Sequence, residues 1–375
     1  MVSQNRRSDR RSGGGGRRRG RRRGQRRRRP GRGRLNPVAL FVNPRSRANR
    51  RNPRVASQFQ ALLGEHGRVF APKTLDELDS DAVSLRSKPP SVIAVHGGDG
   101  TLHRAVAALG KAFGDTPLPP LAMLGGGTMN VVSASLGIRQ KAAPFLSAIV
   151  GAVRAERPLE TVRRRCLRIG DTLGFIFGNG LMANFLGEYY GQGEYGPARA
   201  TWLLLRAVGS AIIDGPFIHK IFKRFEGTVE VDGRMLERTV FIGIGAATVR
   251  EVGLGFKLNH RADDDVERFG ALAIHGRPIG LIPDFWSVYT GKGVSPKRSF
   301  SAVASTMTIV PKEGSMAYTI DGDLYRGEGP LTISIGPHVE FVRPPALSAL
   351  AGAPAPRALP PGQDAATATP VPPPR

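Results

Sequence analysis

The chain has 375 residues, with 55 Lys and Arg against 30 Asp and Glu, which gives a formal net charge of +25. Its apolar content of 40% is enough to build buried cores, which excludes a wholly disordered chain and suggests two domains. A single cysteine excludes an internal disulfide and a zinc site built from several cysteines, so we expect a reducing, cytoplasmic setting.

The first 34 residues form a tail rich in arginine and glycine. They contain 16 Arg and one Asp, a net charge of +15, and they lack the apolar segment of a secretory signal. A segment of this composition buries too little apolar surface to offset the entropy of ordering, so we expect it to be disordered. Its charge favours contact with an anionic lipid surface, with nucleic-acid phosphates as the alternative.

Residues 35–160 alternate short apolar runs with stretches of helical periodicity. The pattern predicts strands at 38–42, 68–71 and 91–95 and helices at 55–67, 76–87 and 101–109, and residues 121–137 repeat the order of strand, glycine-rich loop and helix. Strands that alternate with helices are typical of a parallel sheet covered by helices. We therefore predict an α/β domain over this range.

Residues 161–343 alternate apolar and polar residues between glycine-containing turns, which is the pattern of antiparallel strands. We expect a mainly antiparallel β-sandwich domain, interrupted by a helix at 197–213 and a second one at 279–290. The most apolar long window, residues 201–218, contains Arg206 and Asp214 and fits an amphipathic helix better than a membrane span. Residues 344–375 are rich in Pro and Ala and are expected to be disordered.

Three loops at the ends of predicted strands have the chemistry of phosphate binding. In HGGDG (96–100), glycines allow close approach of the backbone, and the following helix offers free N–H groups. Asp99 beside phosphates indicates a Mg²⁺ ion or a substrate hydroxyl between them. The loops at 43–47 and 125–130 follow other strands, and such loops face one crevice in an open α/β sheet. We expect the three to converge on a nucleotide.

Neither GxxxxGK[ST] nor a GxGxxG dinucleotide fingerprint is present. Instead, the chain contains in order N-P-x-S (43–46), V-x-G-G-D-G-T (95–101), G-G-G-T-M-N (125–130) and Y-T-I-D-G-D (318–323). With these motifs the sequence resembles the diacylglycerol kinase catalytic-domain family, which includes bacterial diacylglycerol kinases and the sphingosine and ceramide kinases. The resemblance covers residues 36–343 in outline. It implies transfer of the γ-phosphoryl group of ATP, with Mg²⁺, to a lipid hydroxyl.

The resemblance also implies roles for individual residues. Asp323 matches the general base of the family, where other members carry Glu, and Asp321 is the alternative; Asp99 is the third catalytic candidate. The Asp321-Gly322 pair by itself is also an ordinary hairpin signal. The residues expected to bind ATP are Asn43, Pro44, Arg45, Ser46, Arg47, Thr74, Gly97, Gly98, Asp99, Gly100, Thr101, Gly127, Thr128 and Asn130.

Other residues admit two interpretations. Asp264 and Asp265 resemble the place where bacterial members bind a structural Mg²⁺, and a solvated acidic loop is the alternative. His96 and His103 flank the GGDGT loop without a partner at catalytic spacing, so we interpret them as structural or exposed residues. Apolar residues in 181–190 and 201–218 are candidates for a lipid pocket.

The sequence therefore predicts a cytoplasmic, peripherally membrane-associated lipid kinase acting on diacylglycerol or on a ceramide or sphingoid-type lipid. Two alternatives stay open. One is another GGDGT phosphotransferase, similar to the dinucleotide kinases, and the other is a non-enzymatic membrane or nucleic-acid binder that keeps a degraded kinase fold.

Overall fold

A computed structural model of the chain describes residues 38–126, 130–191 and 196–344. The arginine-rich segment 1–34 and nearly all of the Pro/Ala-rich segment 344–375 lie outside these residues.

The first part of the chain builds a parallel sheet with the strand order β2-β1-β3-β4. Its strands are β1 (Val38–Val42), β2 (Gly67–Phe70), β3 (Val92–Gly97) and β4 (Leu121–Gly125). Every residue of β1 and β3 is buried, which explains their continuous apolar runs, because a parallel sheet covered on both faces leaves no strand face in water. The predicted strands in this region are confirmed.

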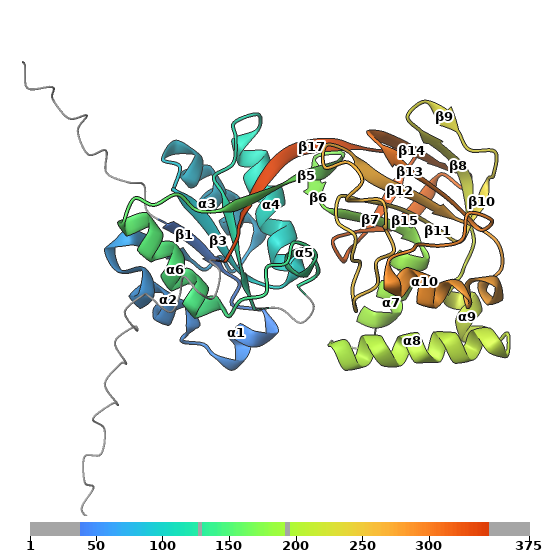
Figure 1. The fold of residues 1–375 in the computed structure, drawn as a ribbon, viewed down its shortest axis with the longest axis horizontal. Helices are drawn as coiled ribbons and strands as arrows, with labels where there is room; N and C mark the ends of the chain where they lie inside the picture. The colour runs from blue at the N-terminus through green and yellow to red at the C-terminus, as the bar shows by residue number, and fades with distance from the viewer. Residues whose placement is uncertain (1–37, 127–129, 192–195, 345–375) are drawn as a thin grey trace, which may run out of the picture. The chain divides into compact units, whose positions relative to one another are not determined.

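Helices connect and cover these strands (Figure 1). They are α1 (Arg47–Arg51), α2 (Val55–Leu63), the short 3₁₀ helix η1 (Gly64–His66), α3 (Leu75–Ser87), α4 (Asp99–Phe113), α5 (Val131–Ser135) and α6 (Ala142–Arg154). Helix α4 packs against α3 and buries Leu102, Val106, Leu109 and Phe113, which recur every three or four residues and so share one face. The predicted helices are present, α4 begins two residues earlier than expected, and α1 and α6 are additional.

Two long strands extend this sheet and connect it to the second half of the chain. Strand β5 (Thr161–Ile169) pairs antiparallel with β17 (Leu331–Val342), and β17 also pairs parallel with β4 through Phe341 and Leu121. The end of the described chain thereby returns to the first sheet (Figure 1). In the described residues this sheet has eleven strands, including β6 (Thr172–Gly174), β8 (Phe225–Val231), β9 (Arg234–Met235), β10 (Val240–Phe241) and β14 (Thr306–Pro311).

A second, antiparallel sheet has the order β13-β12-β11-β7-β15-β16. Its strands are β7 (Ile176–Gly180), β11 (Gly243–Ala247), β12 (Phe269–Ile274), β13 (Ser299–Ala304), β15 (Ser315–Ile320) and β16 (Asp323–Glu328). Side chains from this sheet, such as Phe177 and Ile244, share one buried core with Val229 and Met307 from β8 and β14. The predicted fold class is therefore confirmed: an α/β domain is followed by an antiparallel β-sandwich.

Short helices pack beside the second sheet: α7 (Leu181–Tyr190), α8 (Pro197–Ile212), α9 (Pro216–Ile221), the 3₁₀ helix η2 (Pro278–Leu281) and α10 (Asp284–Thr290). The predicted helix at 197–213 is confirmed as α8. The predicted helix at 279–290 is divided into η2 and α10, which begins after Pro283. In the part of the chain that the structure describes, no helix combines the length and apolar character needed to cross a bilayer.

Candidate active site

The GGDGT segment forms the turn from β3 into α4. Gly97 ends the strand, and α4 begins at Asp99. A Cβ atom on Gly97 would lie 2.3 Å from Thr101 Oγ1, so the turn has no room for a side chain at this position. The tight turn leaves backbone N–H groups of the first helical turn directed out of the helix, which is the arrangement that binds phosphate.

The first loop is tied to this turn by a hydrogen bond. Asn43, which follows β1, donates from Nδ2 to Thr101 Oγ1 over 2.9 Å. Its own side-chain oxygen accepts from the backbone N–H of Arg45, and its carbonyl oxygen accepts from Asn49 Nδ2. The structure thus brings the 43–46 and 97–101 motifs together, as the sequence predicts.

The side chain of His96 contacts both α1 and β4 next to this turn. Its ring nitrogens lie 3.0 Å from Asn49 Oδ1 and 3.0 Å from the carbonyl oxygen of Leu124, and its side chain is buried. Burial lowers the pKa of His96 below its ordinary value. These contacts fit the structural interpretation of His96.

Asp99 connects the GGDGT turn to the next loop. Its carboxylate accepts from the backbone N–H of Val132 over 3.3 Å and from that of Val131, at the start of α5. Burial raises the pKa of Asp99, and the nearby charge of Asp321 raises it further. Asp99 is therefore a partly buried carboxylate that links the start of α4 to the start of α5.

Asp321 and Gly322 form the two-residue turn between β15 and β16. Ile320 pairs with Asp323 across the hairpin, and the turn residues have φ angles of +50° and +94°. Positive φ at both positions is the requirement of the hairpin turn that Asp-Gly favours. The hairpin interpretation of Asp321-Gly322 is correct for the backbone, and it places two carboxylates on either side of the turn.

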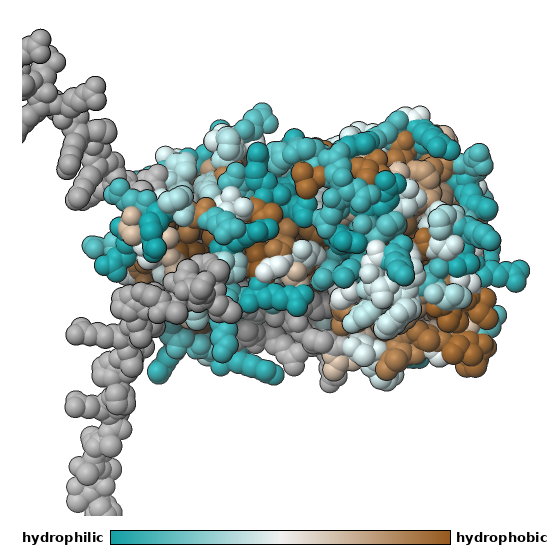
Figure 2. All heavy atoms as spheres, viewed as in Figure 1, coloured by the Kyte–Doolittle hydropathy of each residue, from teal (hydrophilic) through white to brown (hydrophobic). Residues whose placement is uncertain are grey.

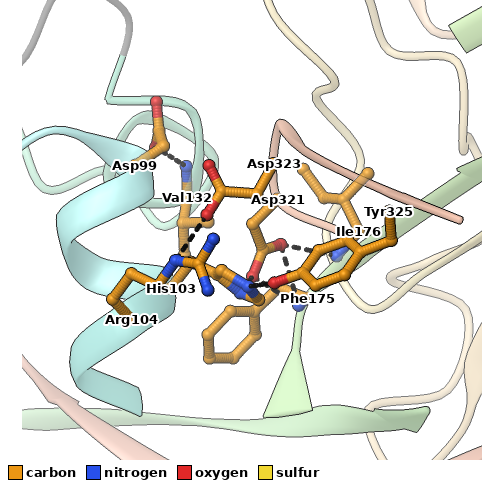
Figure 3. Close-up of polar contacts among 9 residues, drawn as sticks. All are labelled: Asp99, His103, Arg104, Val132, Phe175, Ile176, Asp321, Asp323 and Tyr325. Carbon is orange, nitrogen blue, oxygen red and sulfur yellow. Dashed lines mark hydrogen bonds and ion pairs between the residues drawn. The ribbon is translucent and has the colours of Figure 1, made fainter. Parts of the chain in front are cut away.

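The two carboxylates have different surroundings (Figure 3). Asp321 is buried and points inward, where its Oδ1 accepts from the backbone N–H groups of Phe175 (2.9 Å) and Ile176 (2.8 Å). Its Oδ2 lies 3.2 Å from Nδ1 of His103, whose Nε2 lies 2.7 Å from the hydroxyl of Tyr325. The oxygens of Asp321 are thus used to hold the hairpin against β7 and α4.

Asp323 is the carboxylate that faces the phosphate loop. Its Oδ2 lies 2.8 Å from Arg104 Nε, and a Cβ atom added to Gly100 would lie 3.5 Å from its Oδ1. Both side chains of the ion pair are partly exposed and line a cavity. The structure therefore distinguishes the two acidic candidates by position: Asp321 is a buried anchor, and Asp323 lies beside the GGDGT turn.

One cavity of about 990 Å³ joins the phosphate loops to the apolar side of the second domain. Its polar end is lined by Asn43, Arg45, Ser46, Arg50, Gly98, Asp99, Gly100, Thr101, Arg104, Asp321 and Asp323. Its remaining wall is mainly apolar and comes from α7, α8, α9, η2 and α10, with Phe185, Leu204, Leu281 and Val288 among its members. Both segments predicted to form a lipid pocket, 181–190 and 201–218, contribute side chains to this wall.

The other predicted site residues that the structure describes are not part of the wall of this cavity. Pro44 is in the first loop outside the cavity wall, and Thr74 caps α3 by accepting from the backbone N–H of Glu77. Asn130 is the N-cap of α5 and has a φ angle of +49°. Arg47 begins α1, with no description of its side chain, and Gly127 and Thr128 lie outside the described residues.

The acidic segment that was a candidate for a structural Mg²⁺ is engaged in local contacts. Asp264 pairs with Arg261 over 2.8 Å, and Asp265 accepts from the backbone N–H of Glu267. Within the described ranges, no group of three or more His, Cys, Asp or Glu side chains is arranged to hold a metal ion. The metal role of Asp264 and Asp265 stays a prediction.

Arg104 and Tyr325, at the centre of the site, were not identified from the sequence, and the buried contacts of His103 with Asp321 and Tyr325 fit its structural interpretation. His103 and Arg104 lie on the first two turns of α4, and His103 is four residues after Asp99, hence on the same helix face. The spacing of four residues between Asp99 and His103 is the signal in the sequence that could have placed His103 in the site. Burial raises the pKa of Tyr325, whose hydroxyl lies 2.7 Å from His103 Nε2.

Comparison with known proteins agrees with this geometry. Residues 37–160 match the family model described as the diacylglycerol kinase catalytic domain. A crystal structure of a diacylglycerol kinase from Bacillus anthracis str. Sterne is similar over 84% of this chain and 98% of its own, with 17% sequence identity and a TM-score of 0.58. A second structure from that organism, provisionally assigned as a diacylglycerol kinase, covers 83% of this chain and 96% of its own, with 17% identity and a TM-score of 0.62. No curated protein is similar enough to the chain to count as a match.

At this level of identity the solved structures establish the fold, and the family model establishes the domain. The phosphate loops that converge through Asn43 and Thr101 lie within the matched residues. Residues 37–160 are therefore similar to the diacylglycerol kinase catalytic domain, and the described chain shares the fold of the solved diacylglycerol kinase structures.

Proposed function

We propose that the protein transfers the γ-phosphoryl group of ATP to a hydroxyl group of a membrane lipid. The observation that supports the proposal is that the cavity of about 990 Å³ contains both kinds of surface, with phosphate-loop residues at one end and an apolar wall beyond Asp323. A lipid acceptor also has a polar end and an apolar end, because its headgroup carries the hydroxyl and is attached to long apolar chains. A dinucleotide acceptor offers no apolar chain for this wall, which disfavours the alternative phosphotransferase.

The polar end suits the triphosphate of ATP. Backbone N–H groups from Gly98 to Gly100 at the start of α4, together with Arg45 and Arg50, place positive charge around the loop. Because Thr101 Oγ1 accepts from Asn43, its own proton is directed elsewhere and can be donated to a phosphate oxygen. ATP as the donor also places the reaction in the cytoplasm, where ATP is supplied.

The residues present fit Mg²⁺ bound to ATP. This ion is usually held by one or two carboxylates together with substrate phosphates, and the carboxylate of Asp99 lies in the wall beside the phosphate loop. Bound Mg²⁺ would offset the negative charge of the phosphates during transfer. Asp99 is the residue that would hold it, because it lies at the GGDGT turn itself, whereas Asp321 is buried and contacts His103 and β7.

Asp323 is the proposed general base. It flanks the GGDGT turn, as the spacing to Gly100 shows, and it lies between the loop and the apolar wall, where a lipid hydroxyl would arrive. A carboxylate at this position takes the proton from the attacking hydroxyl as the bond to phosphorus forms. Arg104, paired with Asp323, orients the carboxylate and adds positive charge near the transferred group.

The substrate class that the wall supports is a lipid with long acyl or alkyl chains, such as diacylglycerol, ceramide or a sphingoid base. Such a substrate resides in a membrane, so the enzyme has to act there as a peripheral protein. The arginine-rich tail would add attraction to anionic lipid, about 1 kcal/mol for each arginine near the surface. A nucleic-acid role for the tail is the second candidate.

The test is transfer of labelled phosphate from ATP to a panel of lipids in detergent micelles with Mg²⁺. We expect one lipid class to be labelled, and we expect Asp323→Asn to reduce turnover by about 10²- to 10⁴-fold while ATP binding is kept. The matched control is Asp79→Asn, which removes a carboxylate paired with Lys111 outside the cavity wall. Labelling of NAD instead of lipid would support the dinucleotide alternative, and ATP binding without labelling of any acceptor would support the non-enzymatic binder.

A further inference from the structure

Helix α8 is apolar on both of its sides. Ala200, Leu203, Ala207 and Ala211 are buried against the protein. The opposite side exposes Trp202, Leu205 and Ile212, and the stripe continues to Ile213 just after the helix. The exposed fractions are 66% for Leu205, 64% for Ile212 and 78% for Ile213. A surface helix normally turns polar residues to solvent, so this stripe indicates a partner that is itself apolar.

The stripe continues onto neighbouring helices. Helix η2, which packs against α8, exposes Ile279, and α10 exposes Phe285, Trp286 and Tyr289. Figure 2 shows apolar side chains gathered over the region where α8 lies in Figure 1. We define the apolar rim as the exposed residues Trp202, Leu205, Ile212, Ile213, Ile279, Phe285 and Trp286.

The apolar rim is continuous with the central cavity. Leu205 and Phe285 are exposed to solvent and also line the cavity of about 990 Å³. The cavity therefore reaches from Gly98–Thr101 and Asp323 to the rim through apolar wall residues. A partner on the rim would cover the apolar opening of the cavity.

Positive charge accompanies the rim. Residues 196–224 contain five Lys and Arg against one Asp. The guanidinium carbon of Arg206 lies 5.3 Å from the centre of the Trp202 ring and 4.1 Å from that of Phe217, and the guanidinium of Arg199 also lies over Trp202. Tryptophan beside arginine suits the headgroup level of a bilayer, where an aromatic ring meets anionic phosphates.

We propose that the apolar rim docks on an anionic lipid bilayer, with Trp202 and Trp286 at the headgroup level, so that the cavity opens directly into the membrane. The identity of the ligand that enters rests on the proposed function. A second copy of this chain fits less well, because a twofold dimer through the rim would bring the same cationic surface of α8 and α9 against itself. A bilayer provides both an apolar phase for the rim and anionic charge for the arginines.

The chain contains only two tryptophans, Trp202 and Trp286, and both belong to the rim. Their fluorescence in the full-length protein therefore reports on this surface and not on the arginine-rich tail. With vesicles of phosphatidylcholine and phosphatidylglycerol at a 3:1 ratio, we expect a blue shift of the emission. We also expect quenching when the phosphatidylcholine carries bromine on its acyl chains.

The test variant is the double substitution Ile212→Gln and Ile213→Gln, which leaves both tryptophans and the charge unchanged. It should weaken vesicle partitioning by about tenfold, because two apolar side chains no longer enter the bilayer. The matched control is Leu75→Gln with Val83→Gln on α3, where the exposed fractions are 56% and 57%. The control should bind vesicles as the wild type does.

Two results would overturn the proposal. Sedimentation with vesicles while the tryptophan emission stays unchanged would mean that another part of the chain binds lipid. A blue shift that grows with protein concentration in the absence of lipid, together with dimers in analytical ultracentrifugation, would assign the rim to self-association.

Phosphorylation of short-chain diacylglycerol in detergent micelles separates this proposal from the proposed function. Phosphorylation of the lipid, without a change in tryptophan emission when vesicles are added, would contradict the docking surface alone. A blue shift of tryptophan emission with vesicles, without phosphorylation of any lipid, would contradict the kinase function alone.

Discussion

Arg104 Nε lies 2.8 Å from Asp323 Oδ2, and this ion pair joins α4, which follows the GGDGT turn, to the first residue of β16. The contact spans 219 residues of sequence and crosses from the α/β domain to the β-sandwich. It therefore holds the proposed base over the proposed phosphate site. Next to it, His103 lies 3.2 Å from Asp321, so consecutive residues of α4 contact both acidic residues of the hairpin (Figure 3).

Replacing Arg104 should slow catalysis more than it weakens binding. We expect Arg104→Ala to reduce kcat by about 10- to 100-fold with little change in KM for the lipid, because a charge aimed at the transferred group acts mainly in the transition state. Arg104→Lys should restore part of the rate, since it keeps the charge without the planar guanidinium. Steady-state kinetics check this. The control is Arg268→Ala, which breaks a pair with Asp232 on another hairpin and should leave kcat unchanged.

Asp321 and Asp323 should differ in what they contribute to stability. Asp321→Asn should lower the free energy of unfolding by about 2–4 kcal/mol, because a buried carboxylate loses charge-assisted hydrogen bonds and leaves His103 poorly paired. Asp323→Asn should change it by less than about 1 kcal/mol, since its ion pair is partly exposed. Urea unfolding measures both. Equal losses in the two variants would contradict the assignment of Asp321 as the anchor and Asp323 as the base.

The burial of Asp99 predicts a pH dependence of stability. Burial raises the pKa of Asp99 in the folded state above its unfolded value, so the folded protein binds this proton more tightly. The contribution of Asp99 then favours folding at low pH and is lost as the pH rises through the folded-state pKa. Asp99→Asn removes this loss and keeps an oxygen that can accept from Val132.

The Asp99→Asn protein should therefore be more stable than the wild type at neutral pH and inactive as a kinase. The difference in stability should shrink as the pH falls toward 4. Thermal unfolding between pH 4 and 8 gives the comparison. A variant that is less stable than the wild type at pH 7 would mean that hydrogen bonds to the charged carboxylate outweigh the cost of its burial.

Thr319 should contact the acceptor lipid. It is buried on β15 and lines the cavity, and its Oγ1 lacks a hydrogen-bond partner among the described residues. A buried hydroxyl without a partner costs about 1–3 kcal/mol, which a polar group of the substrate would recover. Thr319→Val should raise KM for the lipid about tenfold, by the loss of one hydrogen bond, and leave KM for ATP unchanged.

The same substitution should not lower the free energy of unfolding, because valine has the shape of threonine and removes the unsatisfied hydroxyl. Thr319→Ser, which keeps the hydroxyl, is the control and should bind lipid nearly as the wild type does. A Thr319→Val protein with normal KM for lipid but reduced stability would show a structural role instead.

Local signals in the sequence were sufficient for the elements and for the phosphate loops. The buried runs at 38–42 and 91–95 predicted the strands β1 and β3, because a fully covered parallel strand has no polar face. The glycines of GGDGT predicted the turn into α4, and at Gly97 the structure leaves no room for a side chain. Helix α7 was not predicted, because its sequence LMANFLGEYY is short and contains glycine, which weakens the helical signal.

The sequence by itself determined the α/β and antiparallel order of the chain, the loop motifs and the Asp-Gly hairpin, because each depends on residues close together in the chain. Only the tertiary structure decided which of the two hairpin carboxylates faces the phosphate loop, and that His103, Arg104 and Tyr325 belong with them. It also decided that β17 returns to β4 and that one cavity joins the polar loops to the helices of the second domain. These features depend on the register of strands and on packing between residues up to 222 positions apart, for which the local pattern of a sequence carries no signal.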